Sequence, residues 1–451
     1  MIITTSDKHI RTWKMQAAIP LRRIQRDPSG GGQGEGGALS SLPLSLECAC
    51  VSFLAIRDVA SLSMASRAAA RLIEEWFRIP RKLTLDAGHE GPDDLWCRFA
   101  LLASRHSRAV TAIDLDLKEE WPDYTSSRLG PLIVQMVTNN ANSLQFIDIP
   151  VKMTSQAMWT ALLECSKLQR LDMITEDDIK YNVGACAAAV IERRRDTITM
   201  LCSSANLTTM VDALSAQPRL KTILSDVTLS RNADTCRRFF ELLGQQTALR
   251  MLELNLDADG LSYAEERLLV PHGKLLTQSL QCMSRLTRLD LLLECHLDMD
   301  PVTLPELVSL NLFDEVNTTK KNRRLPMIRA PKLQDLNVGG SSASMCVDAL
   351  FNLGADASLV RVTMSTPIVL SWLLKLESKS LAARLAASKF PLLEKWDSHA
   401  FGMTEDIAMT LAKNSPRLVF FSFTLSGPVH TDLPSQLVRS PTCCLYFIEF
   451  S

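Results

Sequence analysis

The side chains best suited to chemistry in this sequence are seven histidines and twelve cysteines, which could ligate a metal or act as nucleophiles. Their closest grouping is Cys295-His296, with Cys282 upstream. The sequence contains no Cys-x-x-Cys, Gly-x-Ser-x-Gly, Walker A or His-Glu-x-x-His pattern. We therefore interpret Cys295-His296 as a structural segment with a buried thiol, and we predict a non-catalytic protein with no cofactor and no metal.

A second group of candidate residues follows a repeated pattern, Leu-x-x-Leu-x-Leu, whose fifth position is often acidic. The acids at this position are Asp114, Asp148, Asp172, Glu253 and Asp290. Three apolar side chains stand at the third position of their copies, namely Phe146, Met200 and Met251. Together these eight residues predict a surface for a protein substrate with a basic, partly apolar segment.

The alternative interpretation of the acids is structural. Acidic side chains keep an exposed strand face soluble, and Arg170 and Arg288, at the third position of their copies, could neutralise their neighbours.

The elements that must position these residues are the copies of the pattern itself, which recur every 21 to 37 residues. The copies are VTAIDL (110–115), LQFIDI (144–149), LQRLDM (168–173), ITMLCS (198–203), LKTILS (220–225), LRMLEL (249–254), LTRLDL (286–291), LVSLNL (307–312), LQDLNV (333–338), LVRVTM (359–364) and LVFFSF (418–423), with LLEKWD (392–397) a weaker twelfth. Positions 1, 4 and 6 should point into a shared core, while positions 3 and 5 should project from the opposite face.

Helix-like segments lie between the copies, for example at 155–167, 235–246, 344–356 and 405–416. One short strand and one helix per unit resembles the leucine-rich-repeat family, although Asn206 is the one clear match to that family's asparagine. The resemblance implies an α/β solenoid with parallel strands on its concave face and helices on its convex face. The last strand should lie in CCLYFIEF (443–450).

Two short amphipathic helices precede the repeats, between Leu42 and Trp76. In the second one, Leu72, Ile73, Trp76 and Phe77 belong to a single apolar stripe, and Pro80 closes the run. A unit of this size buries too little surface to fold alone. It should therefore pack against the repeats, against a partner, or against both.

This segment also resembles an F-box. The matching pairs and triplets are Leu42-Pro43, Ser52-Phe53-Leu54, Asp58-Val59, Leu62-Ser63 and Ser66-Arg67, while Ser45, Glu47 and Cys50 depart from the family's pattern. The resemblance implies docking on a Skp-type adaptor and, through it, a cullin. The residues that it assigns to docking are Leu42, Pro43, Leu46, Phe53, Leu54, Asp58, Val59 and Leu62.

An F-box followed by leucine-rich repeats is similar to the F-box/leucine-rich-repeat family. That order of modules implies a substrate-recognition subunit of a Skp–cullin–F-box ubiquitin ligase, in which the ubiquitin-conjugating enzyme supplies the chemistry. Two alternatives stay open at this point. One is a repeat scaffold whose N-terminal helices only cap the solenoid, and the other is a repeat-built GTPase activator with a catalytic group at a repeat edge.

Composition bounds these interpretations. The formal net charge of -1 gives no electrostatic reason to expect nucleic acid, and no apolar run is long enough to span a membrane. Free cysteines without a secretory signal favour a reducing, cytoplasmic compartment. The basic cluster at 320–324 could add a nuclear import signal, but an exposed loop explains it as well.

We accordingly divide the 451 residues into four parts. The predicted parts are a basic and Gly-rich disordered leader (1–38), an all-α F-box-like unit (39–80), a connecting and capping helical region (81–109) and the solenoid (110–451).

Overall fold

The structure is a computed structural model, in which contacts divide the chain into Met1–Glu47 and Cys48–Ser451. All described residues belong to the second unit. They are 59, 63, 65, 67–78, 81–86, 93–116, 123–148, 155–174, 182–204, 206–216, 219–229, 232–258, 269–295, 297–314, 326–340, 343–354, 358–365, 384, 388–403, 405–425 and 445–450. The predicted leader and first amphipathic helix lie outside the described residues.

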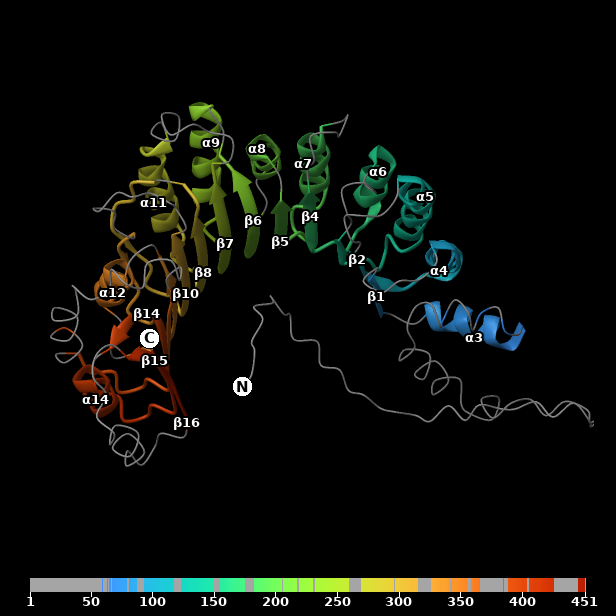
Figure 1. The fold of residues 1–451 in the computed structure, drawn as a ribbon. Coiled ribbons are helices and arrows are strands. Elements are labelled where there is room, and N and C mark those ends of the chain that lie inside the picture. Colours follow the sequence, from blue (N-terminus) through green and yellow to red (C-terminus); the bar gives the residue numbers. More distant parts are fainter. Residues whose placement is uncertain are drawn as a thin grey trace, which may run out of the picture. The chain divides into compact units, whose positions relative to one another are not determined.

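One sheet organises the second unit, and its strands follow one another in chain order (Figure 1). It comprises β1 (Arg81–Asp86), β2 (Val110–Asp116), β3 (Phe146–Asp148), β4 (Arg170–Ile174), β5 (Met200–Ser204), β6 (Thr222–Thr228), β7 (Met251–Asp257), β8 (Arg288–Leu293), β10 (Ser309–Asp314), β12 (Asp335–Gly339), β13 (Arg361–Ser365), β14 (Lys395–Met403), β15 (Phe420–Leu425) and β16 (Leu445–Phe450). Every pair is parallel. The predicted α/β repeat fold is therefore confirmed, including its closing strand.

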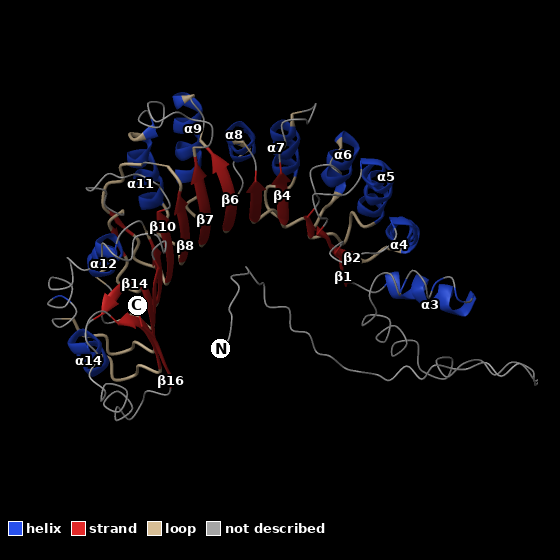
Figure 2. Ribbon diagram, in the orientation of Figure 1, coloured by secondary structure: helices blue, strands red, loops and turns tan. Residues whose placement is uncertain are grey.

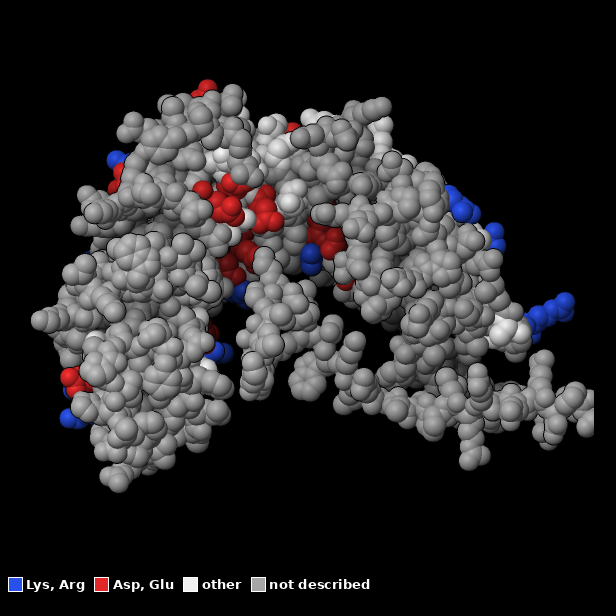
Figure 3. Space-filling view, in the orientation of Figure 1, with Lys and Arg blue, Asp and Glu red and all other residues white. Residues whose placement is uncertain are grey.

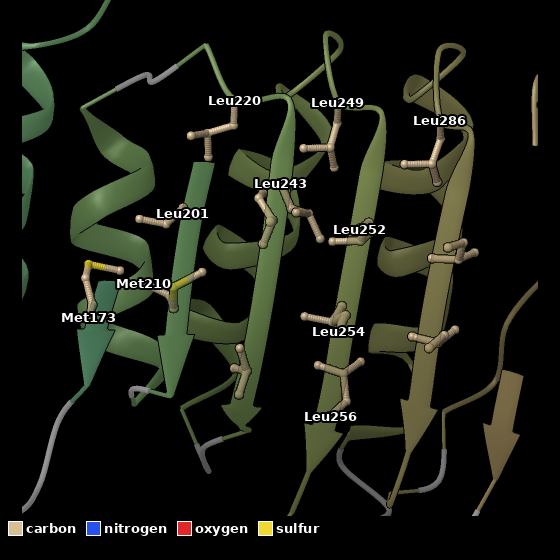
Figure 4. Close-up of a cluster of buried hydrophobic side chains, with 14 of the residues drawn as sticks. Met173, Leu201, Met210, Leu220, Leu243, Leu249, Leu252, Leu254, Leu256 and Leu286 are labelled. Carbon is tan, nitrogen blue, oxygen red and sulfur yellow. The ribbon is translucent and has the colours of Figure 1, made fainter. Parts of the chain in front are cut away.

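The register of the sheet matches the repeated pattern residue for residue. Leu201, Ile223 and Leu252 occupy position 4 of consecutive copies and pair with one another. All three side chains are fully buried. Leucines at positions 1 and 6 extend the same core between strands and helices (Figure 4). Replacing one such leucine by alanine costs roughly 2–5 kcal/mol, so the core fixes the register.

The helices lie on one face of this sheet (Figure 2). They are α4 (Asp93–His106), α5 (Asp123–Asn139), α6 (Gln156–Glu164), α7 (Val183–Arg193), α8 (Leu207–Ser215), α9 (Ala233–Gly244), α11 (His272–Cys282), α12 (Ala343–Asn352) and α14 (Glu405–Asn414). The four helix-like segments predicted above correspond to α6, α9, α12 and α14. The other face of the sheet is left to the side chains at positions 3 and 5.

Local sequence explains where several helices begin. Asn182, Asn206 and Asn232 each stand just before a helix and accept a backbone N–H with the side-chain oxygen, which satisfies an otherwise unpaired donor. Asn206, the residue that matches the repeat family's asparagine, is thus the N-cap of α8.

Helices do not occupy every connection. Between β8 and β12 the described connections carry two short strands, β9 (Val302–Thr303) and β11 (Ile328–Arg329), which pair in a separate sheet. The connection from β8 to β10 is among the shorter ones, and the extended β9 occupies it.

The sheet begins one strand earlier than the sequence predicted. Residues 81–109 were expected to be a connecting and capping helical region. Its helix is present as α4, but β1 precedes that helix and pairs in parallel with β2, with Leu83 opposite Ile113. Counting back from Leu83 at position 4 places Pro80 at position 1, where the pattern demands leucine. That substitution concealed the first copy.

The predicted register of the twelfth copy was wrong by one residue. The sequence placed Trp396 at position 5 and Glu394 at position 3. Trp396 instead pairs with Val362 at position 4 and is fully buried, so Lys395 takes position 3 and Asp397 takes position 5. Leu393 rather than Leu392 fills position 1, because its side chain is also fully buried.

The second predicted N-terminal helix corresponds to α3 (Arg67–Arg78). Its apolar stripe turns inward, since Ile73, Trp76 and Phe77 are buried, and Trp76 meets Phe77 edge to face at 4.9 Å between ring centroids.

Candidate partner-binding face

The face of the sheet opposite the helices presents the third and fifth positions of each copy as two columns. The fifth-position column pairs Asp114 with Asp148, Asp172 with Cys202, and Glu253 with Asp290. Acidic side chains gather on this face (Figure 3). The structure therefore places the predicted acids in two groups, on β2 to β4 and on β7 and β8, with about 4.8 Å from one strand to the next. Cys202 and Leu224 separate the two groups.

Asp172 is an enclosed acid of the column. Its side chain is 6% exposed, and its carboxylate accepts a hydrogen bond from Arg170 Nε at 2.8 Å. Burial raises the pKa of Asp172, and the bond from Arg170 opposes that rise. Arg170 and Asp172 stand two residues apart on the same strand and the same face, so β4 neutralises its own acid.

Arg170 also covers Phe146, which was predicted to contact a substrate. The guanidinium carbon lies 4.3 Å from the centroid of the Phe146 ring. The two residues are registered partners on β3 and β4. One face of the ring is thus engaged in a cation–π contact, and less of it is open to a partner.

Cys202 follows Asp172 in the column and could be mistaken for a nucleophile. Burial and the neighbouring Asp172 carboxylate raise the pKa of this thiol. A thiol must ionise to attack, so Cys202 remains protonated and unreactive at neutral pH.

A second acidic group lies further along the sheet, on β7 and β8. Asp290 accepts hydrogen bonds from Arg288 Nη2 at 2.6 Å and from Asn311 Nδ2 at 2.8 Å. Glu253, its registered neighbour, forms no ion pair with any described residue. Burial, Asp290 and Asp226 raise the pKa of Glu253, and Arg288 opposes them.

Asp226 was missed by the sequence analysis, because it lies beyond the end of the hexamer. It stands two residues after Leu224 in β6 and so extends the same alternation to a seventh position. Following the alternation of Thr222, Leu224 and Asp226 past the hexamer would have found it.

Apolar side chains lie between the two acidic groups. Met200, Thr222 and Met251 are consecutive partners at position 3, and Leu224 lies between Cys202 and Glu253 at position 5. All four are partly exposed. The centre of this stretch can therefore accept an aliphatic side chain.

From β10 onward the same columns balance their own charges. Asp335 pairs with Arg361 at 2.6 Å, and Asp397 pairs with Lys395 at 3.4 Å. Asn311, Asn337 and Thr363 fill the fifth position between them.

Of the residues assigned to adaptor docking, the structure describes Val59, whose side chain is 1% exposed and contributes to the chain's own core. Leu42, Pro43, Leu46, Phe53, Leu54, Asp58 and Leu62 lie outside the described residues, and their docking role stays a prediction.

The remaining motifs have structural roles where they are described. Cys295 is fully buried and Cys282 is exposed, while His296 is outside the described residues. Arg194, just past the end of α7, donates a hydrogen bond to the Leu163 carbonyl near the end of α6. The basic cluster at 320–324 also lies outside the described residues.

The described part of the chain also limits the class of site. No group of three His, Cys, Asp or Glu side chains in that part of the chain could hold a metal ion. None of the helices described above is long and apolar enough to cross a membrane.

No protein-family model matches this chain, and no curated protein sequence matches it. Among solved structures, the crystal structure of the Rad7 and Elc1 complex in yeast is similar over 85% of this chain and 86% of that chain, with a TM-score of 0.33 and 12% identity. A Bacteroides fragilis protein is similar over 51% of this chain and 65% of its own, with a TM-score of 0.27 and 15% identity. Likeness at this level carries no functional argument, so the proposal below is built from the chain's own residues.

Proposed function

We propose that this protein is a leucine-rich-repeat receptor that binds a basic segment of a protein substrate on the strand face. The observation that carries the proposal is the face formed by β2 to β8, which no described helix covers. Among its described side chains at positions 3, 5 and 7 there are six carboxylates and two guanidiniums, an excess of four negative charges (6 − 2).

Charge of one sign on one continuous surface favours an oppositely charged partner and accelerates its association. The partly exposed Met200, Leu224 and Met251 add apolar contact in the middle of that surface. A segment with basic and aliphatic side chains satisfies both features at once.

We further propose that the receptor works in a Skp–cullin–F-box ubiquitin ligase, on the strength of the F-box resemblance at Leu42 to Arg67. In this role the chain performs no chemistry of its own. It converts an encounter between substrate and conjugating enzyme into a local reaction. The buried stripe of α3 leaves the docking role to residues before it, because Ile73, Trp76 and Phe77 are occupied inside the chain.

Co-purification with a Skp-type adaptor tests the ligase role. The wild-type chain should retain the adaptor, and the double substitution Leu42→Ala/Pro43→Ala should lose most of it. Glu253→Gln, on the strand face, is the matched control and should retain the adaptor as wild type does.

If the wild-type chain fails to retain the adaptor under conditions in which an established F-box protein retains it, the ligase role is wrong. The protein would then be a repeat scaffold whose N-terminal helices serve as a cap.

A further inference from the structure

His272 is a buried histidine that lies away from the strand face described above. It is the first residue of α11, and it is only 6% exposed. Its ring lies beside the ring of Phe240 on α9, with 6.4 Å between the two centroids. The two helices are neighbours on the helical side of the sheet (Figure 1). His272 therefore lies where the helices of two neighbouring units meet.

Both ring nitrogens of His272 are closed to solvent. Neither Nδ1 nor Nε2 has a hydrogen-bond partner in the described part of the chain. A neutral imidazole carries one donor and one acceptor, whereas the protonated ring carries two donors and a positive charge. Burying an unpaired charge costs far more than burying an unpaired polar group. The folded chain therefore favours the neutral ring.

Two sources of positive charge also oppose protonation of the ring. The first is the start of α11, where the aligned peptide dipoles place partial positive charge and no side chain caps the helix. The second is Arg237, which stands one turn before Phe240 on α9. Burial and the charge of Arg237 lower the pKa of His272.

The other charged groups on the elements packed against the ring supply no counter-charge. On α9, on α11 and in the connection to β9 they are all exposed, and no ion pair joins His272 to a described carboxylate. Charged residues of β7 and β8 stand at odd positions of their copies, which places them on the opposite face of the sheet. The exposed groups are Asp234, Arg238, Glu241, Lys274, Asp298 and Asp300.

The start of α11 is packed too closely to adjust by small shifts. A Cβ atom at Gly273 would lie 2.4 Å from the carbonyl oxygen of Asp298, so the helix rests directly on the backbone of the next connection. On the other side, Ser279 Oγ donates a hydrogen bond to the Phe240 carbonyl at 2.6 Å. Close-packed elements change between discrete arrangements rather than deforming continuously. A charged ring can therefore reach water only if the first turn of α11 leaves its place.

We propose that His272 makes the start of α11 an acid-sensitive joint, which opens when the ring takes up a proton. In the open state the ring is in water and is protonated below its ordinary pKa of 6.5, whereas the closed state resists protonation. Below that pH the open state is favoured by up to about tenfold for each pH unit, until the closed state is protonated as well.

Hydrogen exchange of the full chain, followed by mass spectrometry, tests the joint. The amides of α11 are compared at pH 7.5 and pH 5.5, and each rate is corrected for the effect of pH on an unstructured amide. In the wild type we expect the opening equilibrium of the first turns of α11 to rise roughly fivefold at the lower pH. In His272→Gln, whose side chain cannot take up a proton, the rise should be less than about twofold.

Two further variants sharpen the measurement. Arg237 is exposed, so Arg237→Gln should keep the fold. Without that charge the closed ring takes up a proton more readily, and the rise should fall to roughly half of the wild-type value. His106→Gln is the matched control, because His106 is a partly exposed histidine at the end of α4, and it should show the wild-type rise in α11.

An equal rise in the wild type and in His272→Gln would overturn the proposal. A wild-type opening equilibrium that does not change between the two pH values would do the same, and so would a rise of wild-type size in Arg237→Gln. The chain is measured without a partner, so none of these results affects adaptor co-purification or peptide binding at the strand face.

Discussion

The strand face divides into two halves that share one geometry and differ in how their charges are arranged. From β2 to β8 its carboxylates outnumber its guanidiniums by four, whereas from β10 to β15 two acids meet two bases. The backbone register is the same in both halves, so the fold does not require this difference. An excess of one charge costs stability through repulsion, and the proposed binding of a basic segment would offset that cost.

The two halves also differ in how far their Arg–Asp ion pairs are exposed to solvent. Arg170 and Asp172 are enclosed, with exposed fractions of 30% and 6%, whereas Arg361 and Asp335 are open at 62% and 34%. A pair in water contributes little, because solvent screens it and the long side chains lose freedom on pairing. An enclosed pair contributes chiefly by preventing an unpaired buried charge.

The largest effect should come from Arg170→Met, which leaves the enclosed Asp172 without its cation. We expect a loss of about 2 kcal/mol in the free energy of unfolding, less than a fully buried pair would lose because Arg170 is partly exposed. Arg361→Met, the matched change in the other half, should lose less than about 1 kcal/mol. Urea denaturation at neutral pH measures both values.

The double variant Arg170→Met/Asp172→Asn provides the control for that result. Removing the carboxylate's charge along with the arginine should restore most of the lost stability, because no unpaired charge remains. Equal losses in Arg170→Met and Arg361→Met would mean that the two halves do not differ in this respect.

Arg288→Met should have a smaller effect, which is an increase in the affinity for a basic peptide. Without Arg288, Asp290 loses its ion pair and Glu253 loses the nearby cation that opposes its raised pKa, so the local potential becomes more negative. A short labelled peptide with basic and aliphatic side chains should then bind roughly fivefold more tightly, equivalent to about 1 kcal/mol. Fluorescence polarisation at low salt measures the change, and Arg361→Met should leave the affinity as in wild type.

The smallest expected effect is a pH-dependent gain in folding stability when Glu253 is replaced by glutamine. The pKa of Glu253 is raised in the folded state above its ordinary value of 4.5, so the unfolded chain ionises first as the pH rises. The folded state is therefore penalised once the pH passes that value, and the penalty is complete above the folded pKa. Glu253→Gln should stabilise the protein at pH 7 by roughly 0.2–0.5 kcal/mol, since the carboxyl is solvent-exposed.

At pH 3 the carboxyl is protonated in both states, and the advantage of glutamine should vanish. Thermal denaturation at the two pH values measures the difference. A stabilisation that is equal at both would assign it to packing rather than to charge.

Most of the fold could be predicted because a strand that buries one face must place apolar residues at fixed positions. Apolar residues, mostly leucine, at positions 1 and 4 and in most copies at position 6 revealed the register of eleven copies. The pattern failed where another residue filled a leucine's place, as Pro80 does before β1. It also failed where two leucines competed for position 1, as Leu392 and Leu393 do.

The candidate site was predicted in composition but not in its contacts. Alternation placed Arg170, Asp172 and Phe146 on one face and showed that Arg170 could neutralise an acid, yet it could not reveal that the same guanidinium also covers the Phe146 ring. Such contacts depend on which rotamer a long side chain adopts between two strands. Asp226 was missed because the pattern was followed for six residues while β6 continues.

The order of the strands in the sheet, which follows the chain, also determines how the protein unfolds. Strands that are neighbours in the sheet are also neighbours in the chain. The contacts that build the sheet therefore join residues a few tens apart in a chain of 451. Closing such short loops costs little entropy, and opening one unit need not open those beyond its neighbours. Without a partner, each of the five units from β4 to β8 contacts only the units next to it. A segment bound across all five would contact every one of them. Those five units would then unfold together.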